Sequence, residues 1–316
     1  MNTHDKAQLV EEQCVEVGAA EAVMAVVKLG AGQLDVGGGA ESLLEARFTY
    51  DDPDLKPEVC YEVDAGRGRL DVTHAVQRGI SCSRRNQDWR LRFNDTIPLD
   101  LSLSVGAGSV ALDGGTLNLT DFTVQMGSGR ITAAMNGTLS QLERVKLNAA
   151  SGQLALNMAG EYPALRTLEL GTASGKHDLT LTGTFPALEK LTIGSANGTI
   201  NLALAGHYDT LKKVEVNTAN GVINLDVTEA RQDLEVAFSC ISGKVVVRVP
   251  DGIGVRIYHS SISGKVVAEG FRRKNGHYVN AAYGEAEVTL NLTVSSINSR
   301  VEVQPVEATS VYKDER

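Results

Sequence analysis

Four stretches in the middle of the chain repeat one pattern: VKLNAASGQLALNMAG (145–160), LELGTASGKHDLTLTG (168–183), LTIGSANGTINLALAG (191–206) and VEVNTANGVINLDVTE (214–229). Their central glycines are 23 residues apart, at Gly152, Gly175, Gly198 and Gly221, and Gly129 comes one interval earlier. Further glycines at intervals of 21 or 22 residues extend the series: Gly108, Gly243 and Gly264. A repeat of this length predicts a solenoid in which each unit stacks on its neighbour along the chain.

Apolar residues alternate with polar ones on both sides of each glycine, as at Val145 and Leu147 before Gly152 and at Leu154 and Leu156 after it. A period of two predicts β-strands with one buried face. The small residues at the centre, such as Asn197-Gly198, suit a tight bend because glycine and asparagine tolerate positive φ. We therefore expect a bend between two faces of one coil rather than an isolated hairpin.

Two further positions recur in every repeat and predict internal ladders. A leucine lies ten residues before each glycine, and a large residue lies thirteen before it: Leu142, Leu165, Leu188 and Leu211, then Leu139, Tyr162, Phe185 and Tyr208. His177 interrupts a third apolar ladder, between Leu154 and Ile200 in the aligned repeats. A single ring without partner residues favours a partly buried histidine whose ring nitrogens are satisfied by hydrogen bonds, or a local turning of the strand, over a functional site.

The first 98 residues do not keep the strict interval. They contain two stretches that look related, VKLGAGQLDV (27–36) and VDAGRGRLDV (63–72), separated by a strand, polar turn and strand between residues 42 and 63. We expect an all-β protein: a small N-terminal β capping domain (1–98), a parallel β-solenoid with rungs of about 21 to 23 residues (99–304) and a polar tail (305–316).

Near the other end of the chain, the stretch Phe271 to Gly284 looks like an insertion after the last glycine of the series. Lys274-Asn275-Gly276-His277 within it predicts a hairpin tip, because Asn-Gly favours tight turns between strands. Alternating strand patterns resume at 288–294 and 300–303.

The charge balance argues against a nucleic-acid partner. The 316 residues include 30 lysines and arginines against 39 aspartates and glutamates, a net charge of −9. Two basic runs, Arg84-Arg85 with Arg90 and Arg92, and Phe271-Arg272-Arg273-Lys274, are short, and we interpret them as solvated surface.

The chain shows no leader and no apolar segment long enough to span a bilayer, so we expect a soluble, cytoplasmic protein. Association with the cell envelope is the alternative if a leader is missing from this sequence. Cysteines lie at Cys14, Cys60, Cys82 and Cys240, without zinc-ligand spacing. We expect reduced thiols, with Cys240 as a small core residue, and a Cys60–Cys82 pair only in an oxidising compartment.

Enzymatic chemistry finds little support in the repeats. Glycine pairs such as Gly30-Ala31-Gly32 precede strands, whereas a nucleotide-binding loop must open a helix. A carbohydrate-active solenoid needs paired acids on one face, and the positions three and five after each glycine bring no two carboxylates together. Asn201 and Asn224 instead predict an amide ladder. We predict no catalytic, cofactor-binding or metal-binding residues.

Several segments together resemble the toast-rack family of bacterial β-solenoid proteins, which is related to LiaF-type envelope-stress regulators and to domains labelled putative adhesins. The segments are Gly30 to Val36, Trp89 to Asp95, Ile97 to Leu101, Val105 to Gly108, Leu117 to Gly129, Gly276 to Tyr283 and Val288 to Leu292. The resemblance implies a non-enzymatic scaffold or sensing module that binds a protein, such as an envelope sensor or membrane protein. An adhesin-like glycan binder is the alternative, and a carbohydrate-active enzyme is a third hypothesis.

Overall fold

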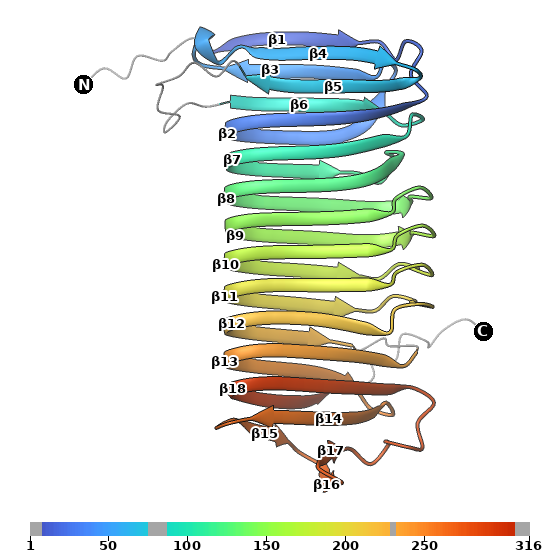
Figure 1. Ribbon diagram of the computed structural model, residues 1–316, viewed down its shortest axis with the longest axis vertical. Helices are drawn as coiled ribbons and strands as arrows, with labels where there is room; N and C mark the ends of the chain where they lie inside the picture. Colours follow the sequence, from blue (N-terminus) through green and yellow to red (C-terminus); the bar gives the residue numbers. More distant parts are fainter. Residues whose placement is uncertain (1–7, 75–86, 228–231, 307–316) are drawn as a thin grey trace, which may run out of the picture.

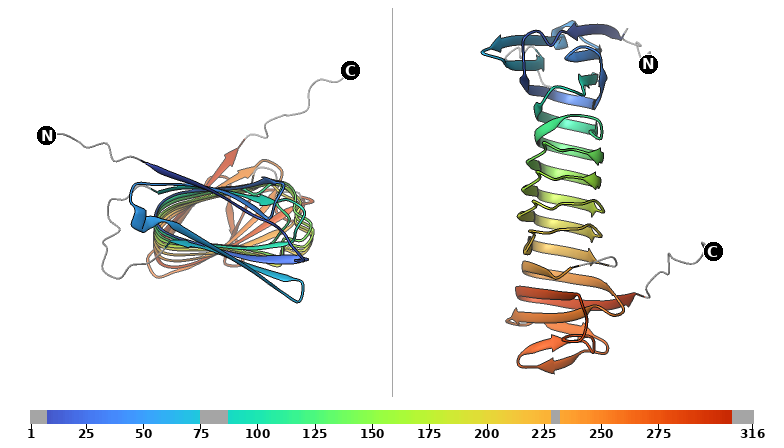
Figure 2. Two further views of the ribbon diagram at one scale, coloured as in Figure 1. Left: turned by 90° about the horizontal axis from the view of Figure 1, so that it is seen from above. Right: turned by 90° about the vertical axis from the view of Figure 1, so that its right-hand side faces the viewer.

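The protein is a long, flattened column of stacked β-rungs in the computed structural model, which describes residues 8–74, 87–227 and 232–306. Figure 1 shows the column upright, and Figure 2 shows its flat oval cross-section from above. Each rung is one strand that bends at its central residue, so its first half lies on one face and its second half on the other. The uninterrupted central rungs are β7 (Leu99–Asp113), β8 (Leu119–Thr138), β9 (Arg144–Glu161), β10 (Thr167–Leu181), β11 (Lys190–Leu204), β12 (Lys213–Asp226) and β13 (Leu234–Pro250).

The rungs pair in parallel, with each glycine beside the next. Gly152, Gly175 and Gly198 are direct register partners in β9, β10 and β11. Their φ values are +132°, +148° and +148°, a region that side chains with a Cβ rarely adopt. The predicted solenoid, its bend at glycine and its interval of 23 residues are therefore confirmed for the central repeats.

The hydrophobic core fills the space between the two faces and runs as one cluster from the first rungs to the last. The predicted ladders are present within it: the leucines ten residues before each glycine are buried, and so are the larger residues thirteen before it. The Tyr162, Phe185 and Tyr208 rings stack face to face, with centroids 4.8 Å and 5.4 Å apart. This aromatic column joins successive rungs on the side opposite the glycine bend.

The N-terminal end is closed by strands of mixed direction. The strand β2 (Ala22–Ala40) is a full rung that pairs in parallel with β7 along both of its halves. On its other side, β5 (Arg67–His74) covers the first half of β2 and β6 (Gln87–Asn94) covers the second half. Three antiparallel strands lie beyond these: β4 (Pro57–Asp64) on β5, then β3 (Leu44–Tyr50) on β6 and β1 (Leu9–Val15) on β3.

The predicted strand, turn and strand between residues 42 and 63 is confirmed as β3, the short helix η1 (Pro53–Leu55) and β4. The prediction that stretches 27–36 and 63–72 are related units is wrong. Gly32 bends β2 between the two faces with φ +146°, whereas Ala65 and Gly66, with φ of +46° and +79°, form the hairpin turn between β4 and β5. The boundary between a capping domain and a solenoid at residues 98 and 99 stays a prediction, as does the tail from 305.

The C-terminal end also departs from simple chain order. After β13 the chain forms β14 (Gly254–Ser261) and β15 (Lys265–Ala268), the two halves of the last rung, and then a hairpin of β16 (Arg272–Lys274) and β17 (His277–Val279). The final strand, β18 (Thr289–Val306), then inserts between β13 and the β14/β15 rung. The neighbour of Gly243 is therefore Ser299 and not Gly264, contrary to the expectation that each rung stacks on the next in sequence.

Candidate functional site

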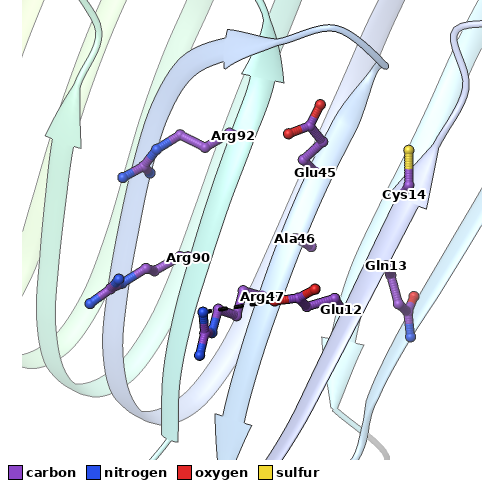
Figure 3. Close-up of a pocket in the computed structure, with 8 residues that line it drawn as sticks. All are labelled: Glu12, Gln13, Cys14, Glu45, Ala46, Arg47, Arg90 and Arg92. Atoms are coloured by element: carbon purple, nitrogen blue, oxygen red, sulfur yellow. Dashed lines mark ion pairs between the residues drawn. The ribbon is translucent and has the colours of Figure 1, made fainter.

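Strands β1, β3 and β6 at the N-terminal end carry a groove of about 560 Å³ on their outer surface, which we call the cap groove. Figure 3 shows its lining: Glu12, Gln13 and Cys14 from β1, Glu45, Ala46 and Arg47 from β3, and Arg90 and Arg92 from β6. These residues come from three segments that lie far apart in the sequence. Antiparallel pairing of β1 with β3 and of β3 with β6 brings them to one surface.

Charged side chains form a row across the cap groove. The register places Glu12 beside Arg47, Arg47 beside Arg90, and Arg90 beside Asp35 of β2. Two arginines thus face each other directly across an antiparallel pair, an arrangement that is unfavourable unless anions balance it.

Ion pairs balance only part of the positive charge in the groove. Arg47 Nη1 lies 3.7 Å from Glu12 Oε1, and Arg92 Nη1 lies 3.0 Å from Asp35 Oδ1. Arg92 also donates to the carbonyl of Leu91 at 3.1 Å, which holds its side chain against β6 and β2. Arg90 is exposed and forms no ion pair with the residues that the structure describes. Exposed pairs of this kind contribute at most about 1 kcal/mol each, so an incoming anion can replace them.

Sequence reasoning found only part of this site. The sequence predicts Arg90 and Arg92 to be solvated surface residues of a short basic run; the structure places both in the cap groove, and Arg84 and Arg85 lie outside the described residues. The sequence analysis did not predict Arg47, Glu12 or Cys14 at this site. These residues lie on antiparallel strands joined by loops of different lengths, so no fixed interval in the sequence relates the residues that come into contact. The second basic run lies at the opposite end of the column, on the exposed strand β16.

The amide ladder is confirmed on the second face of the central rungs. Asn224 Nδ2 donates to Asn201 Oδ1 at 2.7 Å, and Asn201 Nδ2 donates to Asp178 Oδ1 at 2.6 Å. This ladder lines a shallow groove of about 330 Å³, which we call the polar groove, together with Asp226 and Arg248. The grooves therefore offer guanidinium groups at the cap and amides with carboxylates along the column.

A pair of carboxylates occurs on the first face, at positions before the glycine. Asp100 and Asp121 are register partners in β7 and β8, each eight residues before its glycine. Burial raises the pKa of both groups, and the charge of Asp121 raises the pKa of Asp100 further, while Arg144, 3.5 Å from Asp121, counteracts this. Neither side chain lines the cap groove or the polar groove. We interpret the pair as a site of electrostatic repulsion within the sheet.

Replacing Asp100 by asparagine is expected to stabilise the protein at pH 7 by a few tenths of a kcal/mol to about 1 kcal/mol, after allowance for solvent screening. A carboxyl whose pKa is raised by folding binds more protons in the folded state, so wild-type stability falls as pH rises through that raised pKa. Urea unfolding between pH 4 and pH 7 should show a flatter profile for Asp100→Asn. The exposed Asp113 on the same strand supplies the control, Asp113→Asn; an equal effect there would contradict the explanation.

The described cysteines occupy both buried and exposed positions. Cys240 is buried, as predicted, while Cys14 and Cys60 are exposed free thiols. Cys82 lies outside the described residues, so its pairing with Cys60 stays untested. His177 is fully rather than partly buried, and its Nδ1 has no hydrogen-bond partner among the described residues, so the predicted satisfied ring is wrong. The Lys274–His277 hairpin tip is confirmed. Within the described part of the chain, no helix has the length and hydropathy to cross a bilayer.

Solved structures with likeness to this chain come from several bacteria. A putative cell adhesion protein from Clostridium sporogenes is 18% identical, with a TM-score of 0.31, and the alignment covers 95% of this chain and 100% of that one. A putative adhesin from Bacteroides fragilis is 11% identical (TM-score 0.37; 94% and 98% covered), and one from Parabacteroides merdae is 14% identical (TM-score 0.34; 95% and 97% covered).

No curated protein matches the chain. The family comparison covers the N-terminal part, from the capping strands into β9, and therefore includes the cap groove and the first glycine bends. Residues 3–157 match the model described as the N-terminal domain of toast_rack, DUF2154, and this part of the chain belongs to the toast-rack family.

Proposed function

We propose that the protein is a non-catalytic binding module, and that its cap groove binds an acidic segment of a partner protein. The observation that carries this proposal is the convergence of Arg47, Arg90 and Arg92 on one groove, with Arg90 exposed and without an ion pair among the described residues. A guanidinium group presents a planar fork of donors that matches a carboxylate in a bidentate contact. The rigid column then holds the groove at one end of the molecule.

We further propose that the partner belongs to the cell envelope. The resemblance to LiaF-type regulators favours an envelope sensor or another membrane protein as the partner. Family membership supports a binding role without naming this partner, and the residues of the cap groove supply the chemistry that would recognise it.

Two of the cysteines provide a direct test. Cys14 lies in the cap groove, whereas Cys60 lies on β4, on the other face of the column. A photo-activated cross-linker is attached to Cys14 in a variant with Cys60→Ser and Cys82→Ser, and to Cys60 in the matched variant with Cys14→Ser and Cys82→Ser. Irradiation in cells of the source organism should give a protein adduct from Cys14 and not from Cys60. Equal adducts from both positions, or none from Cys14, would contradict the proposal.

Arginine variants give the corresponding affinity measurement. Arg90→Ala and Arg47→Ala are each expected to weaken binding of a fluorescein-labelled oligoglutamate peptide by about tenfold, the usual effect of losing one charge-assisted contact. Arg69→Ala, which removes an exposed arginine paired with Asp71 on β5, is the matched control and should leave the affinity unchanged. Fluorescence anisotropy measures the affinity, and unchanged binding by Arg90→Ala would exclude the groove as the site.

The polar groove supports a second candidate, a glycan-binding role. Its aligned amide, carboxylate and guanidinium groups are the side chains that commonly hydrogen-bond sugar hydroxyls, and Asn201 lies at its centre. A glycan-array screen of the wild type against Asn201→Ala tests this candidate, which predicts a carbohydrate signal that the variant loses.

A further inference from the structure

The outer edge of the glycine bends is free of carboxylates along the whole column. We define this corner edge as the eight residues around each bend, from five before the central residue to two after it: 27–34, 103–110, 124–131, 147–154, 170–177, 193–200, 216–223, 238–245, 259–266 and 294–301. None of these windows contains an aspartate or glutamate, although the chain has 39 of them. They do contain cations: Lys28, Arg130, Lys176, Lys244, Lys265 and Arg300. An acidic protein thus carries more cations than carboxylates along this edge, on the left side of the column in Figure 1, although Lys176 pairs at 2.8 Å with Asp178 just beyond its window.

Three exposed isoleucines stand on this edge, and only in the last three rungs. Two positions before the central residue, the other rungs have alanine or glycine, such as Ala150 or Gly106. The C-terminal rungs have Ile241, Ile297 and Ile262 there, with 52%, 51% and 84% of their surface exposed. We call these three residues the isoleucine ridge.

The three isoleucines lie side by side. Register pairs Cys240 with Ser296 and Ser242 with Asn298, which places Ile241 beside Ile297. On the other side, the amide of Ser263 donates to the carbonyl of Ile297 at 3.0 Å, which places Ile262 beside Ile297. The ridge is therefore continuous across β13, β18 and the β14/β15 rung, at the lower end of Figure 1.

A row of cations runs alongside the ridge in the same three rungs. Lys244 and Lys265 are both register partners of Arg300. Glu302 binds Lys244 at 2.6 Å and Arg300 at 2.5 Å, which neutralises part of this charge. Lys265 forms no ion pair with the described residues. Exposed apolar side chains next to Lys265 and to the positive charge that Glu302 leaves on Lys244 and Arg300 fit a surface that is apolar inside and anionic outside.

We propose that the isoleucine ridge inserts into an anionic lipid surface, with the row of Lys244, Arg300 and Lys265 on the lipid headgroups. The ridge stands on the convex side of a bend, where Ile262 protrudes, and a protruding edge enters a soft lipid layer without needing a matching groove. The charge distribution sets the orientation. Residues 8–74 carry 14 carboxylates against 5 lysines and arginines, while residues 234–306 carry 6 against 8, so the C-terminal end approaches the lipid and the cap is held away.

The test is sedimentation with vesicles of phosphatidylcholine alone and of equal parts phosphatidylcholine and phosphatidylglycerol. The full chain should bind the anionic vesicles and lose binding as salt is raised. A variant with Ile241→Ala, Ile262→Ala and Ile297→Ala takes the residue of the central rungs at each position, and its partition should fall by about tenfold or more. The matched control, Met24→Ala with Val63→Ala, removes exposed apolar side chains from the opposite end and should bind as wild type does.

A pair of charge variants separates local contact from net charge. Lys265→Glu should weaken binding severalfold, while Lys212→Glu, which makes the same charge change away from the corner edge, should have a smaller effect. If the wild type ignores anionic vesicles, or if the triple variant binds them equally well, the proposal is overturned. It is also overturned if sedimentation velocity shows a wild-type dimer that the triple variant dissolves, since a second copy then covers the ridge. Should the triple variant fold poorly, Ile262→Ala alone, at the most exposed position, gives the same comparison.

Discussion

Gly175→Ala is expected to lower the free energy of unfolding by about 4 kcal/mol, because strain at positive φ adds to overpacking. The φ of Gly175 is +148°, and a Cβ built there would lie 1.8 Å from the carbonyl oxygen of Gly152 in the preceding rung. That oxygen belongs to the backbone of a parallel ladder, so it cannot move without breaking the pairing of β9 with β10. The measurement is the urea midpoint followed by far-UV circular dichroism.

Gly194 supplies the matched control in the next rung. Nothing lies within 4 Å of a Cβ built at Gly194, and its φ is not in the positive region. Gly194→Ala should therefore leave stability within about 0.5 kcal/mol of wild type or raise it slightly. Similar losses for both variants would show that the glycine bends do not limit the stability of the column.

The single tryptophan makes the same experiment report on cooperativity. Trp89 is fully buried in β6, packed edge to face on Phe48 with centroids 5.2 Å apart, several rungs from Gly175. In a column whose rungs contact only their neighbours, stability is a sum of local terms. If the column unfolds as one unit, tryptophan fluorescence and circular dichroism of Gly175→Ala shift together. If it unfolds in sections, only the dichroism shifts.

His177→Leu is expected to raise stability and to remove a pH dependence. The imidazole of His177 is fully buried, and burial lowers its pKa to about 4 from an ordinary value near 6.5. Hydrogen bonds define its tautomer: Ser195 donates to the carbonyl of Asn197 at 3.2 Å, so the Thr172 hydroxyl donates to Ser195 at 3.2 Å. Nε2–H of His177 then donates to Thr172 Oγ1 at 2.7 Å, and Nδ1 is a buried acceptor without a donor in the structure.

The sign of the pH effect follows from linkage. Because the unfolded chain binds the proton more readily than the folded one, wild-type stability is complete above pH 6.5 and is lost as pH falls toward 4. The shift corresponds to about 3 kcal/mol. Leucine continues the ladder between Leu154 and Ile200 and should add about 1 to 2 kcal/mol at pH 7, since it removes an unsatisfied buried acceptor.

Urea unfolding of His177→Leu at several pH values between 7 and 4 tests this prediction. His177→Asn is the control: it also removes the titrating ring and should flatten the pH profile, but it keeps a buried polar side chain and should not gain stability at pH 7. A profile for His177→Leu that still falls by about 3 kcal/mol between pH 6.5 and 4 would assign the acid sensitivity to other groups.

Much of the central column was predictable because its rungs are parallel and in register. In that arrangement a residue touches the residues one interval before and after it, so sequence spacing alone predicted the Tyr162–Phe185–Tyr208 stack and the Asn224–Asn201 ladder, which the structure extends to Asp178. The same rule accounts for the Asp100–Asp121 pair, because both residues lie eight positions before the glycine of their rung. Local chemistry predicted the bends as well, because only glycine readily accepts their φ.

The sequence by itself thus determined the all-β solenoid, its interval and its bends. Only the tertiary structure decided the two ends, where the chain reverses and contacts no longer follow a constant interval. Closing the column requires the apolar ends of the core to be covered, and the chain does this by antiparallel strands at the cap and by inserting β18 between β13 and the β14/β15 rung. The cap groove and the isoleucine ridge are products of that closure: one joins β1, β3 and β6, and the other aligns Ile297 between Ile241 and Ile262.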